Sequence, residues 1–300
     1  MRLIPINKLN ADKRVGCPIC QSITCERVID KAFSDADLAQ FLSQFYSNQI
    51  DLDLLENIRF KVAYCADCDF LYQTETLDGS GMALLYDQWV DNQRSLKKKQ
   101  FGAAKLYRQY AGQVEMINRL INRPPGQVAI LEFGMGWGYW SRMAQAYGYQ
   151  VEGFELSQER IAHAKSMGLT VIDQLPTGDR YDFIFSNQVF EHLPDPLETM
   201  IRLGSCLKPD GYIYIRVPDG RGVYNQLKKL GWNSALDAIH PLEHINCFTR
   251  RSLIELASKV SLYPIAEPLR INLQRIRSSL VRAFNDRFLT THILFQSKSL

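Results

Sequence analysis

The chain has 300 residues, which is enough for one large α/β domain and a small additional module. Hydrophobic residues make up 46% of it and charged residues 22%, values that are typical of globular proteins and exclude a disordered or fibrous chain. The net charge of +3 is too small to indicate nucleic-acid binding by itself. No stretch reaches the roughly 18 uncharged apolar residues of a membrane helix, so we expect no membrane span.

The N-terminal sequence MRLIPINKLNADKR lacks the apolar core of a signal peptide, so we expect a cytoplasmic protein with reduced cysteines. Four cysteines form two C-x-x-C pairs, Cys17 with Cys20 and Cys65 with Cys68. Each pair can hold one metal ion through two thiolates, and two pairs complete a tetrahedral site. The spacing therefore predicts a structural zinc site, and the alternative is a pair of reduced turns without metal.

Three regions follow one another along the chain. Residues 1–80 are predicted to form the zinc-binding, ribbon-like module, with a helical insert that begins at Ser34. Residues 81–125 are predicted to be a helical lid or linker, in which Tyr86 and Trp89 either cover a ligand or simply pack.

Residues 126–300 alternate short apolar strands with helices, which predicts a mostly parallel sheet with helices on both faces. The expected strands are 128–133, 151–155, 170–173, 181–186, 212–217, 263–267 and 292–298. The expected helices are 95–121 just before this region and, within it, 137–147, 157–167, 196–207 and 252–260.

A glycine loop follows the first of these strands and leads directly into a helix. It reads Glu132-Phe-Gly-Met-Gly-Trp-Gly138, and the next strand ends at Glu155. Glycines let a ligand approach the backbone beside a helix N-terminus, and a carboxylate at the next strand end can accept both hydroxyls of a ribose. This order of features is shared by dinucleotide sites and S-adenosylmethionine sites.

Three motifs in this order, E-x-G-x-G-x-G, E-H-L-P-D-P and L-K-P-D-G, resemble those of class I S-adenosylmethionine-dependent methyltransferases. The resemblance covers roughly residues 95–300 and is strongest to small-molecule enzymes of sugar and quinone biosynthesis. With the four-cysteine module in front, the chain resembles the C-methyltransferases of deoxysugar biosynthesis. The resemblance implies a Rossmann-like seven-stranded sheet with one antiparallel strand, formed by the segment from His292 onward.

The resemblance also implies which residues hold the methyl donor. Glu132 would orient groups near its amino end, the three glycines would line its methionine part, and Glu155 would bind its ribose. Leu156 would pack on adenine, Asp173 would meet the adenine amine, and two residues after the fourth strand would lie beneath the sulfonium. The full set is Glu132, Gly134, Gly136, Gly138, Glu155, Leu156, Asp173, Asn187 and Gln188.

Methyl transfer to a neutral acceptor needs alignment and the removal of a proton, for which a histidine is suited. Glu191 and His192 follow the fourth strand and are the candidate acid–base pair, the alternative being a role in loop structure. His244, in the segment H-I-N-C-F-T, is a further candidate for the acceptor pocket.

The leading hypothesis is methyl transfer to a small molecule such as a sugar or another secondary metabolite. The alternatives are an RNA methyltransferase whose zinc module binds nucleic acid, a non-catalytic protein that has kept the fold, and a nicotinamide enzyme. The mild charge and the absence of an N-P-P-Y type loop disfavour RNA. An arginine-rich segment at residues 270–287 is predicted to be a solvated helix face, or else a surface for phosphate or membrane.

Overall fold

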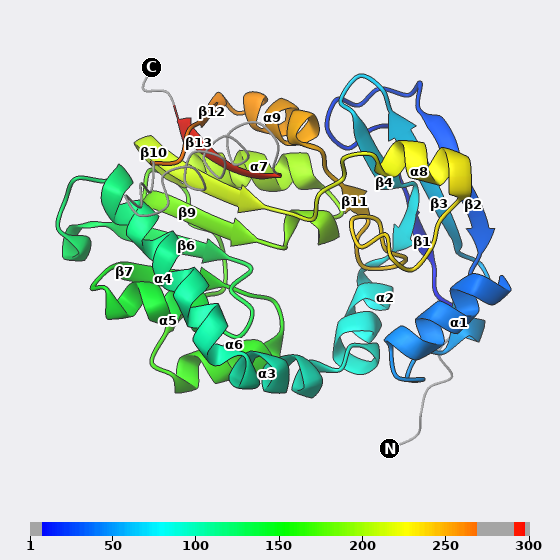
Figure 1. Cartoon of the computed structure of the whole chain (residues 1–300), viewed down its shortest axis with the longest axis horizontal. Helices are drawn as coiled ribbons and strands as arrows, with labels where there is room; N and C mark the ends of the chain where they lie inside the picture. Colours follow the sequence, from blue (N-terminus) through cyan, green and yellow to red (C-terminus); the bar gives the residue numbers. More distant parts are fainter. Residues whose placement is uncertain (1–7, 269–290, 298–300) are drawn as a thin grey trace, which may run out of the picture. The chain divides into compact units, whose positions relative to one another are not determined.

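The computed structural model describes residues 8–268 and 291–297. The arginine-rich segment 270–287 lies outside the described residues. The chain divides into two compact units, each of which draws on several stretches of sequence (Figure 1). The first unit comprises Met1–Ser95, Glu191–Asp195 and Pro218–Ser252, and the second comprises Leu96–Phe190, Pro196–Val217 and Leu253–Leu300.

The second unit is built on a seven-stranded sheet with the order β12-β13-β10-β9-β6-β7-β8. Its strands are β6 (Ala129–Phe133), β7 (Gln150–Phe154), β8 (Thr170–Ile172), β9 (Tyr181–Asn187), β10 (Leu207–Arg216), β12 (Leu262–Ile265) and β13 (His292–Ser297). The pairs from β10 through β9, β6 and β7 to β8 are parallel, whereas β13 runs antiparallel to both of its neighbours. The predicted Rossmann-like, mostly parallel sheet is therefore confirmed.

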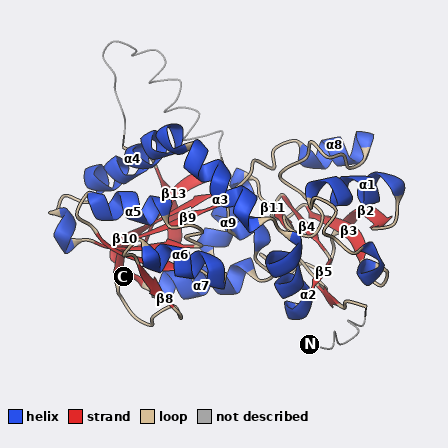
Figure 2. Ribbon diagram, turned by 90° about the horizontal axis from the view of Figure 1, so that it is seen from below, coloured by secondary structure: helices blue, strands red, loops and turns tan. Residues whose placement is uncertain are grey.

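Helices cover both faces of this sheet, with α4 and α5 on one face and α7 on the other (Figure 2). The helices are α3 (Asn92–Phe101, in this unit from Leu96), α4 (Ala103–Leu120), α5 (Tyr139–Ala146), α6 (Gln158–Ser166), α7 (Pro196–Ser205) and α9 (Arg250–Ser258, in this unit from Leu253). Val114 and Ile117 of α4 pack with Trp140 of α5 against Phe183 and Phe185 of β9. A short 3-10 turn, Pro125–Gln127, leads into β6.

Two elements of this unit differ from the expectation. The helix expected over 95–121 is broken at Gly102 into α3 and α4. The strand expected at 212–217 begins earlier, at Leu207, so the motif L-K-P-D-G lies inside β10. The pairing of β10 with β9 shifts register between Leu207 and Tyr212, where Asp210 has a left-handed φ of 59°. A bulge thus absorbs the residues that the sequence suggested were a turn.

The first unit contains a four-stranded antiparallel sheet with the order β11-β4-β3-β2 and a separate pair, β1 with β5. Its strands are β1 (Ala11–Lys13), β2 (Glu26–Ala32), β3 (Arg59–Cys65), β4 (Phe70–Gln73), β5 (Glu75–Leu77) and β11 (Asn246–Cys247). Its helices and helical turns are α1 (Ala36–Phe45), η1 (Leu52–Leu55), α2 (Gly79–Leu84), the π-helical turn η2 (Leu85–Trp89) and α8 (Val223–Leu230). The short turn η4 (Phe190–His192) supplies Glu191 and His192 to this unit.

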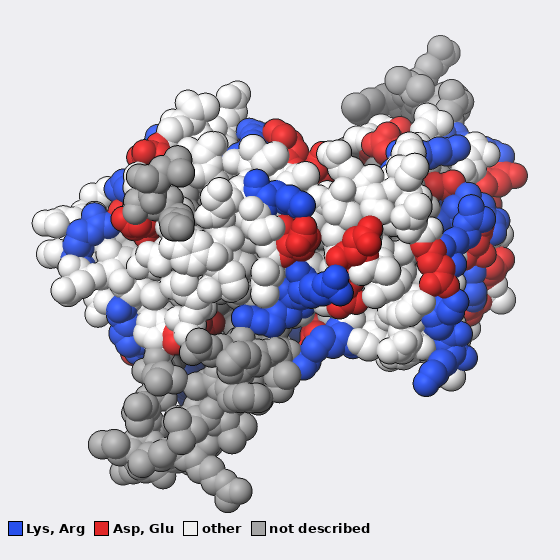
Figure 3. Space-filling view, turned by 90° about the horizontal axis from the view of Figure 1, so that it is seen from above, with Lys and Arg blue, Asp and Glu red and all other residues white. Residues whose placement is uncertain are grey.

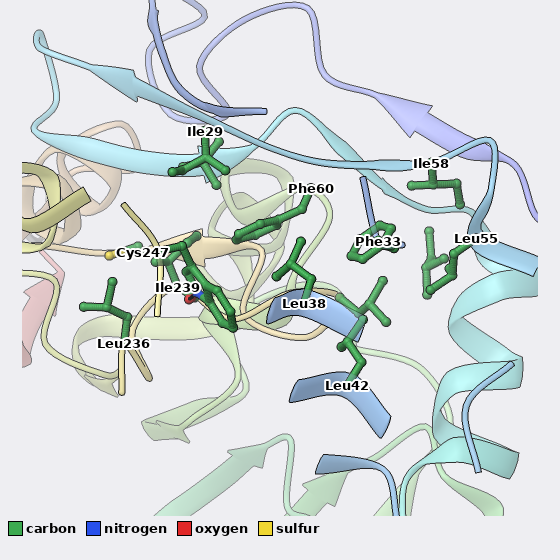
Figure 4. Close-up of a cluster of buried hydrophobic side chains, with 14 of the residues drawn as sticks. Ile29, Phe33, Leu38, Leu42, Leu55, Ile58, Phe60, Leu236, Ile239 and Cys247 are labelled. Atoms are coloured by element: carbon green, nitrogen blue, oxygen red, sulfur yellow. Dashed lines mark hydrogen bonds between the residues drawn. The ribbon is translucent and has the colours of Figure 1, made fainter. Parts of the chain in front are cut away.

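The predicted helical insert between the cysteine pairs is α1, and it forms part of the core of the first unit. Leu38 and Leu42 of α1 are fully buried beside Phe60 of β3 (Figure 4). Residues from much later in the chain, Leu236 and Ile239, complete the same cluster. The first unit therefore needs the segment Pro218–Ser252 for its core.

On the face drawn in Figure 3, lysine and arginine side chains lie among acidic ones and do not gather into one basic surface. Among the described residues, no helix is both long enough and apolar enough to cross a membrane.

Candidate active site

The glycine loop lies between β6 and α5, at the carboxyl edge of the sheet. Gly134, Gly136 and Gly138 all have left-handed φ values, of 74°, 53° and 76°. The N–H groups of Gly134 and Met135 both donate to the carbonyl oxygen of Phe154, over 2.9 and 3.0 Å. These bonds fix the loop to the end of β7. Because φ is positive at all three glycines, a residue with a side chain would be strained at any of these positions.

Glu155 follows β7 and is held by backbone donors on both carboxylate oxygens. The N–H of Gly136 donates to its Oε2 over 2.8 Å. The N–H groups of Leu156 and Ser157 donate to its Oε1 over 2.9 and 3.0 Å. Among the described residues, a methyl group added to Gly136 would meet only one atom within 4 Å, Nζ of Lys99 at 3.8 Å. The loop therefore leaves a cradle beside the carboxylate of Glu155.

Glu132 is buried at the end of β6. Its Oε2 accepts hydrogen bonds from the N–H and the hydroxyl of Ser141, over 3.0 and 2.5 Å. Burial raises the pKa of Glu132 to about 8, against the opposing effects of Ser141 and of the nearby Lys99 ammonium. The carboxyl group is thus poised to exchange a proton near neutral pH.

The other predicted donor-binding residues lie at the same edge of the sheet, because β9, β6, β7 and β8 are parallel neighbours. Leu156 is 78% exposed, and Asp173 is exposed directly after β8. Asn187 ends β9, and its Oδ1 is buried without a hydrogen-bond partner among the described residues. Gln188 is exposed, with a left-handed φ of 60°.

Three features of this edge fit a ligand that carries ribose hydroxyls and the ammonium group of an amino acid. They are the open space at Gly136, the carboxylate of Glu155, and the buried amide oxygen of Asn187, which has no hydrogen-bond partner among the described residues.

Lys99 of α3 was not among the residues that the sequence suggested. It is half-buried beside Glu132 and Glu155, and burial lowers its pKa. Only its contact across the fold identifies it, because a run of three lysines on a helix gives no indication of which one turns inward.

The first unit holds the candidate acid–base residues. Glu191 is completely buried, and burial raises its pKa to about 8. His192 Nε2 lies 4.0 Å from Glu191 Oε1, and His192 Nδ1 is hydrogen-bonded to the Tyr86 hydroxyl over 3.3 Å. The His192 and His244 rings are 4.8 Å apart at nearly a right angle. Trp89 is buried in the core and belongs to the packing.

The segment Glu191–Asp195 is anchored through the carbonyl oxygen of Leu193. Asn246 Nδ2 donates to this oxygen over 2.7 Å, and Arg14 Nη2 donates to it over 3.1 Å. Arg14 Nη1 also donates to Asn246 Oδ1 over 2.8 Å. Arg14 lies three residues before Cys17, so a residue close in sequence to the first cysteine pair is hydrogen-bonded to the loop that carries His192. The sequence does not reveal this, because the partners are far apart along the chain.

The four predicted metal ligands, Cys17, Cys20, Cys65 and Cys68, come together. Their sulfur atoms all lie within 4.8 Å of one another, and Cys20 Sγ is 3.6 Å from Cys65 Sγ. A tetrahedral zinc–thiolate site with bonds of about 2.3 Å requires sulfur–sulfur distances of about 3.8 Å. Burial, with a smaller effect from the neighbouring thiols, raises the pKa of Cys17 to about 12. The cluster therefore fits a tetrahedral metal ion that would stabilise the thiolates.

A family model described as a methyltransferase domain matches residues 103–266, which is more than half of the chain. The chain therefore belongs to this methyltransferase family. Together with the sheet topology and the glycine loop, this membership defines it as a class I S-adenosylmethionine-dependent methyltransferase.

Curated relatives match shorter stretches. Phosphoethanolamine N-methyltransferase 2 of Caenorhabditis elegans is 28% identical over 133 residues, which are 40% of this chain and 30% of that protein. The ubiquinone biosynthesis O-methyltransferase of Haemophilus ducreyi is 31% identical over 103 residues, 29% of this chain and 43% of that protein. The matches thus span less than half the length of these relatives.

Among solved structures, the plantazolicin methyltransferase BpumL in complex with SAH is 14% identical and matches with a TM-score of 0.49, over 73% of this chain and 94% of that one. A TehB-like SAM-dependent methyltransferase from Corynebacterium glutamicum is 18% identical, with a TM-score of 0.45, over 69% of this chain and 98% of that one.

Proposed function

We propose that the protein transfers the methyl group of S-adenosylmethionine to a small-molecule acceptor, such as a sugar or another secondary metabolite. The observation that carries the donor assignment is the hydrogen bond from Gly136 to Glu155, with open space over the same glycine. The acceptor class is supported by the resemblance to deoxysugar C-methyltransferases. Curated relatives named as phosphoethanolamine and ubiquinone-biosynthesis methyltransferases support it as well.

The donor supplies an electrophilic methyl group on a sulfonium, and the chain's residues have to hold it in place. We assign the ribose to Glu155, the methionine part to the glycine loop, and the donor ammonium to the buried carboxylate of Glu132. Leu156 and Asp173 would contact the adenine. Leu156 offers an exposed apolar side chain after β7, and Asp173 offers a carboxylate after the neighbouring strand β8. Asn187 and Gln188, where β9 ends, would complete the site beneath the sulfonium.

On the acceptor side we assign proton removal to His192. Its Nδ1 is engaged with the Tyr86 hydroxyl, which orients the ring. In the tautomer that carries its proton on Nδ1, Nε2 would accept the proton of the acceptor. Glu191 lies beside Nε2 and would stabilise the protonated ring, and His244 would line the acceptor pocket. Aligning the acceptor and removing its proton are the two tasks that a methyltransferase of this kind has to perform.

We further propose that the four cysteines hold one structural zinc ion. Four protein ligands leave no open coordination position, so the metal would stabilise the fold and take no part in methyl transfer. Through Arg14 the same region anchors the carbonyl of Leu193 next to the proposed base. Loss of the metal would therefore disturb the His192 segment as well as the cysteine region.

The test is to incubate the protein with methyl-labelled S-adenosylmethionine and cell extract that has been separated into metabolite and RNA fractions. Label in the metabolite fraction supports the proposal and provides a compound to identify. Label in RNA alone would replace it by an RNA methyltransferase, whose binding should weaken steeply with salt. Absence of label from both fractions, with the donor bound, would indicate a non-catalytic protein.

A further inference from the structure

Apart from the four cysteines, three side chains of the first unit lie close enough together to bind one metal ion. Glu191, His192 and His244 each offer one ligand atom, and these atoms all lie within 4.8 Å of one another. Glu191 is fully buried, and neither of its carboxylate oxygens has a hydrogen-bond partner among the described residues. A buried carboxyl group without a partner is costly, and a bound cation or hydrogen-bond donor would relieve that cost.

The two histidines are oriented by hydrogen bonds on their Nδ1 atoms. His244 Nδ1 bonds to the carbonyl oxygen of Asp237, and therefore acts as the donor. His192 Nδ1 bonds to the Tyr86 hydroxyl over 3.3 Å. When Nδ1 carries the proton, Nε2 carries the lone pair. This is the arrangement that metal-binding histidines usually have, with the other ring nitrogen bonded to a carbonyl or a similar group.

The ligand set selects the kind of cation. Two imidazoles and one carboxylate suit first-row divalent ions such as zinc, cobalt and iron(II), whereas magnesium and calcium prefer oxygen ligands throughout. Three protein ligands also leave coordination positions open, in contrast to the four-cysteine cluster. A cation here would neutralise Glu191 without drawing on any of the cysteines.

We infer that Glu191, His192 and His244 form a second metal site, which binds one divalent first-row transition-metal ion. Its consequence for catalysis rests on the proposed function. The ion would occupy the Nε2 lone pair of His192, which the proposed base needs in order to accept a proton. Metal binding and proton removal at His192 then exclude each other, so occupancy of this site slows methyl transfer.

The binding test uses the full-length protein, loaded with one equivalent of zinc to fill the cysteine cluster and then dialysed against Co²⁺. Bound cobalt is counted by elemental analysis, and its ligands are identified from the visible spectrum. We expect one cobalt ion per chain, without the intense thiolate-to-cobalt absorption that cysteine ligands produce. Glu191→Gln and His244→Ala should each lower cobalt affinity by at least about 10-fold, and Tyr86→Phe by about 10- to 100-fold.

The matched control is His163→Ala, which removes a histidine of α6 in the other unit and should leave the bound cobalt unchanged. Circular dichroism verifies that each variant is folded. The inference fails if no cobalt binds beyond the zinc equivalent, if thiolate absorption accompanies it, or if Glu191→Gln and His244→Ala both bind cobalt as the unchanged protein does.

The activity test separates this inference from the proposed function. Methyl transfer to the labelled metabolite should fall to half at the cobalt concentration that half-fills the site. Unchanged or faster transfer at full occupancy would overturn the exclusion between metal and base. Cobalt binding without methyl transfer to any fraction would leave the metal site standing and remove the proposed function instead.

Discussion

The backbone N–H of Gly136 donates a 2.8 Å hydrogen bond to the carboxylate of Glu155, across the gap between the ends of two adjacent parallel strands. This bond orients the acid toward the loop before any ligand arrives. Two further backbone donors, from Leu156 and Ser157, fix its other oxygen. The acid assigned to the ribose and the loop assigned to the methionine part are therefore held in position relative to each other before the donor binds.

Replacing Gly136 by valine should lower the affinity for S-adenosylmethionine by at least about tenfold, which corresponds to a loss of about 1.4 kcal/mol of binding free energy. The side chain would fill the cradle, and a β-branched residue at a φ of 53° is strongly disfavoured. Calorimetric titration of the folded variant with the donor measures the effect.

Gly168→Ala is the matched control. Gly168 has a similarly left-handed φ of 80°, and a methyl group there would meet no atom of the part of the chain that the structure describes within 4 Å. This variant should lose about 1 kcal/mol of stability and keep its donor affinity. Equal donor affinity in both variants would show that the cradle at Gly136 is not the donor site.

Donor binding should depend on pH through Glu132. Its pKa of about 8 in the folded chain lies above the ordinary value of 4.5, so the carboxyl is mostly protonated below pH 8. Because the donor ammonium would pair with the ionised form, affinity should rise with pH, by up to about tenfold per unit between about pH 6 and 7.5. Ser141, Lys99, Glu155 and Tyr110 face this carboxyl and are affected by its charge.

The same pKa shift predicts the pH dependence of stability without ligand. Between pH 4.5 and about 8 the folded chain holds a proton on Glu132 that the unfolded chain has released. The free energy of unfolding should therefore decrease as pH rises through this window. The Glu132→Gln variant should not show this decrease.

Calorimetry in two buffers of different ionisation enthalpy should also detect proton release on donor binding in the unchanged protein, and none in Glu132→Gln.

Cys65→Ser should remove the zinc ion and destabilise the first unit, because structural zinc contributes directly to folding. The measurements are zinc content per chain and susceptibility to proteolysis at the cysteine region. Cys206→Ala is the control, since Cys206 is buried in the other unit, where its thiol donates to the Pro176 carbonyl. Zinc retained at one equivalent in Cys65→Ser would refute the assignment of the ligands.

His192→Ala should reduce turnover by roughly 100-fold or more if His192 removes the proton from the acceptor. Donor affinity should be unchanged, because the donor site is assigned to residues of the second unit. Single-turnover methyl transfer and donor titration on the same preparation separate the two effects. A variant with full turnover would exclude His192 from the mechanism.

Periodicity and end signals were sufficient to predict most of the sheet. The apolar runs expected as strands at 128–133 and 181–186 form β6 (Ala129–Phe133) and β9 (Tyr181–Asn187). The helix α8 (Val223–Leu230) was missed, since its start follows a run of glycine and charged residues that is typical of a loop. The bulge inside β10 was also missed, because Pro209 and Gly211 are residues that usually mark a turn.

The candidate site was predicted one residue at a time, and the contacts among those residues came from the fold. The carboxylate of Glu155 and the four cysteines could be proposed from spacing alone. The inward turn of Lys99, the Tyr86–His192 hydrogen bond and the Arg14 network join segments up to 232 residues apart. A linear pattern carries no information about such pairings, because tertiary packing decides them.

Calorimetric titration of the purified chain with S-adenosylmethionine, followed by NAD⁺ as a competitor, tests most directly whether the glycine loop binds this donor. We predict one donor molecule bound per chain and no displacement by NAD⁺. Heat of binding with NAD⁺ but none with S-adenosylmethionine would contradict the account.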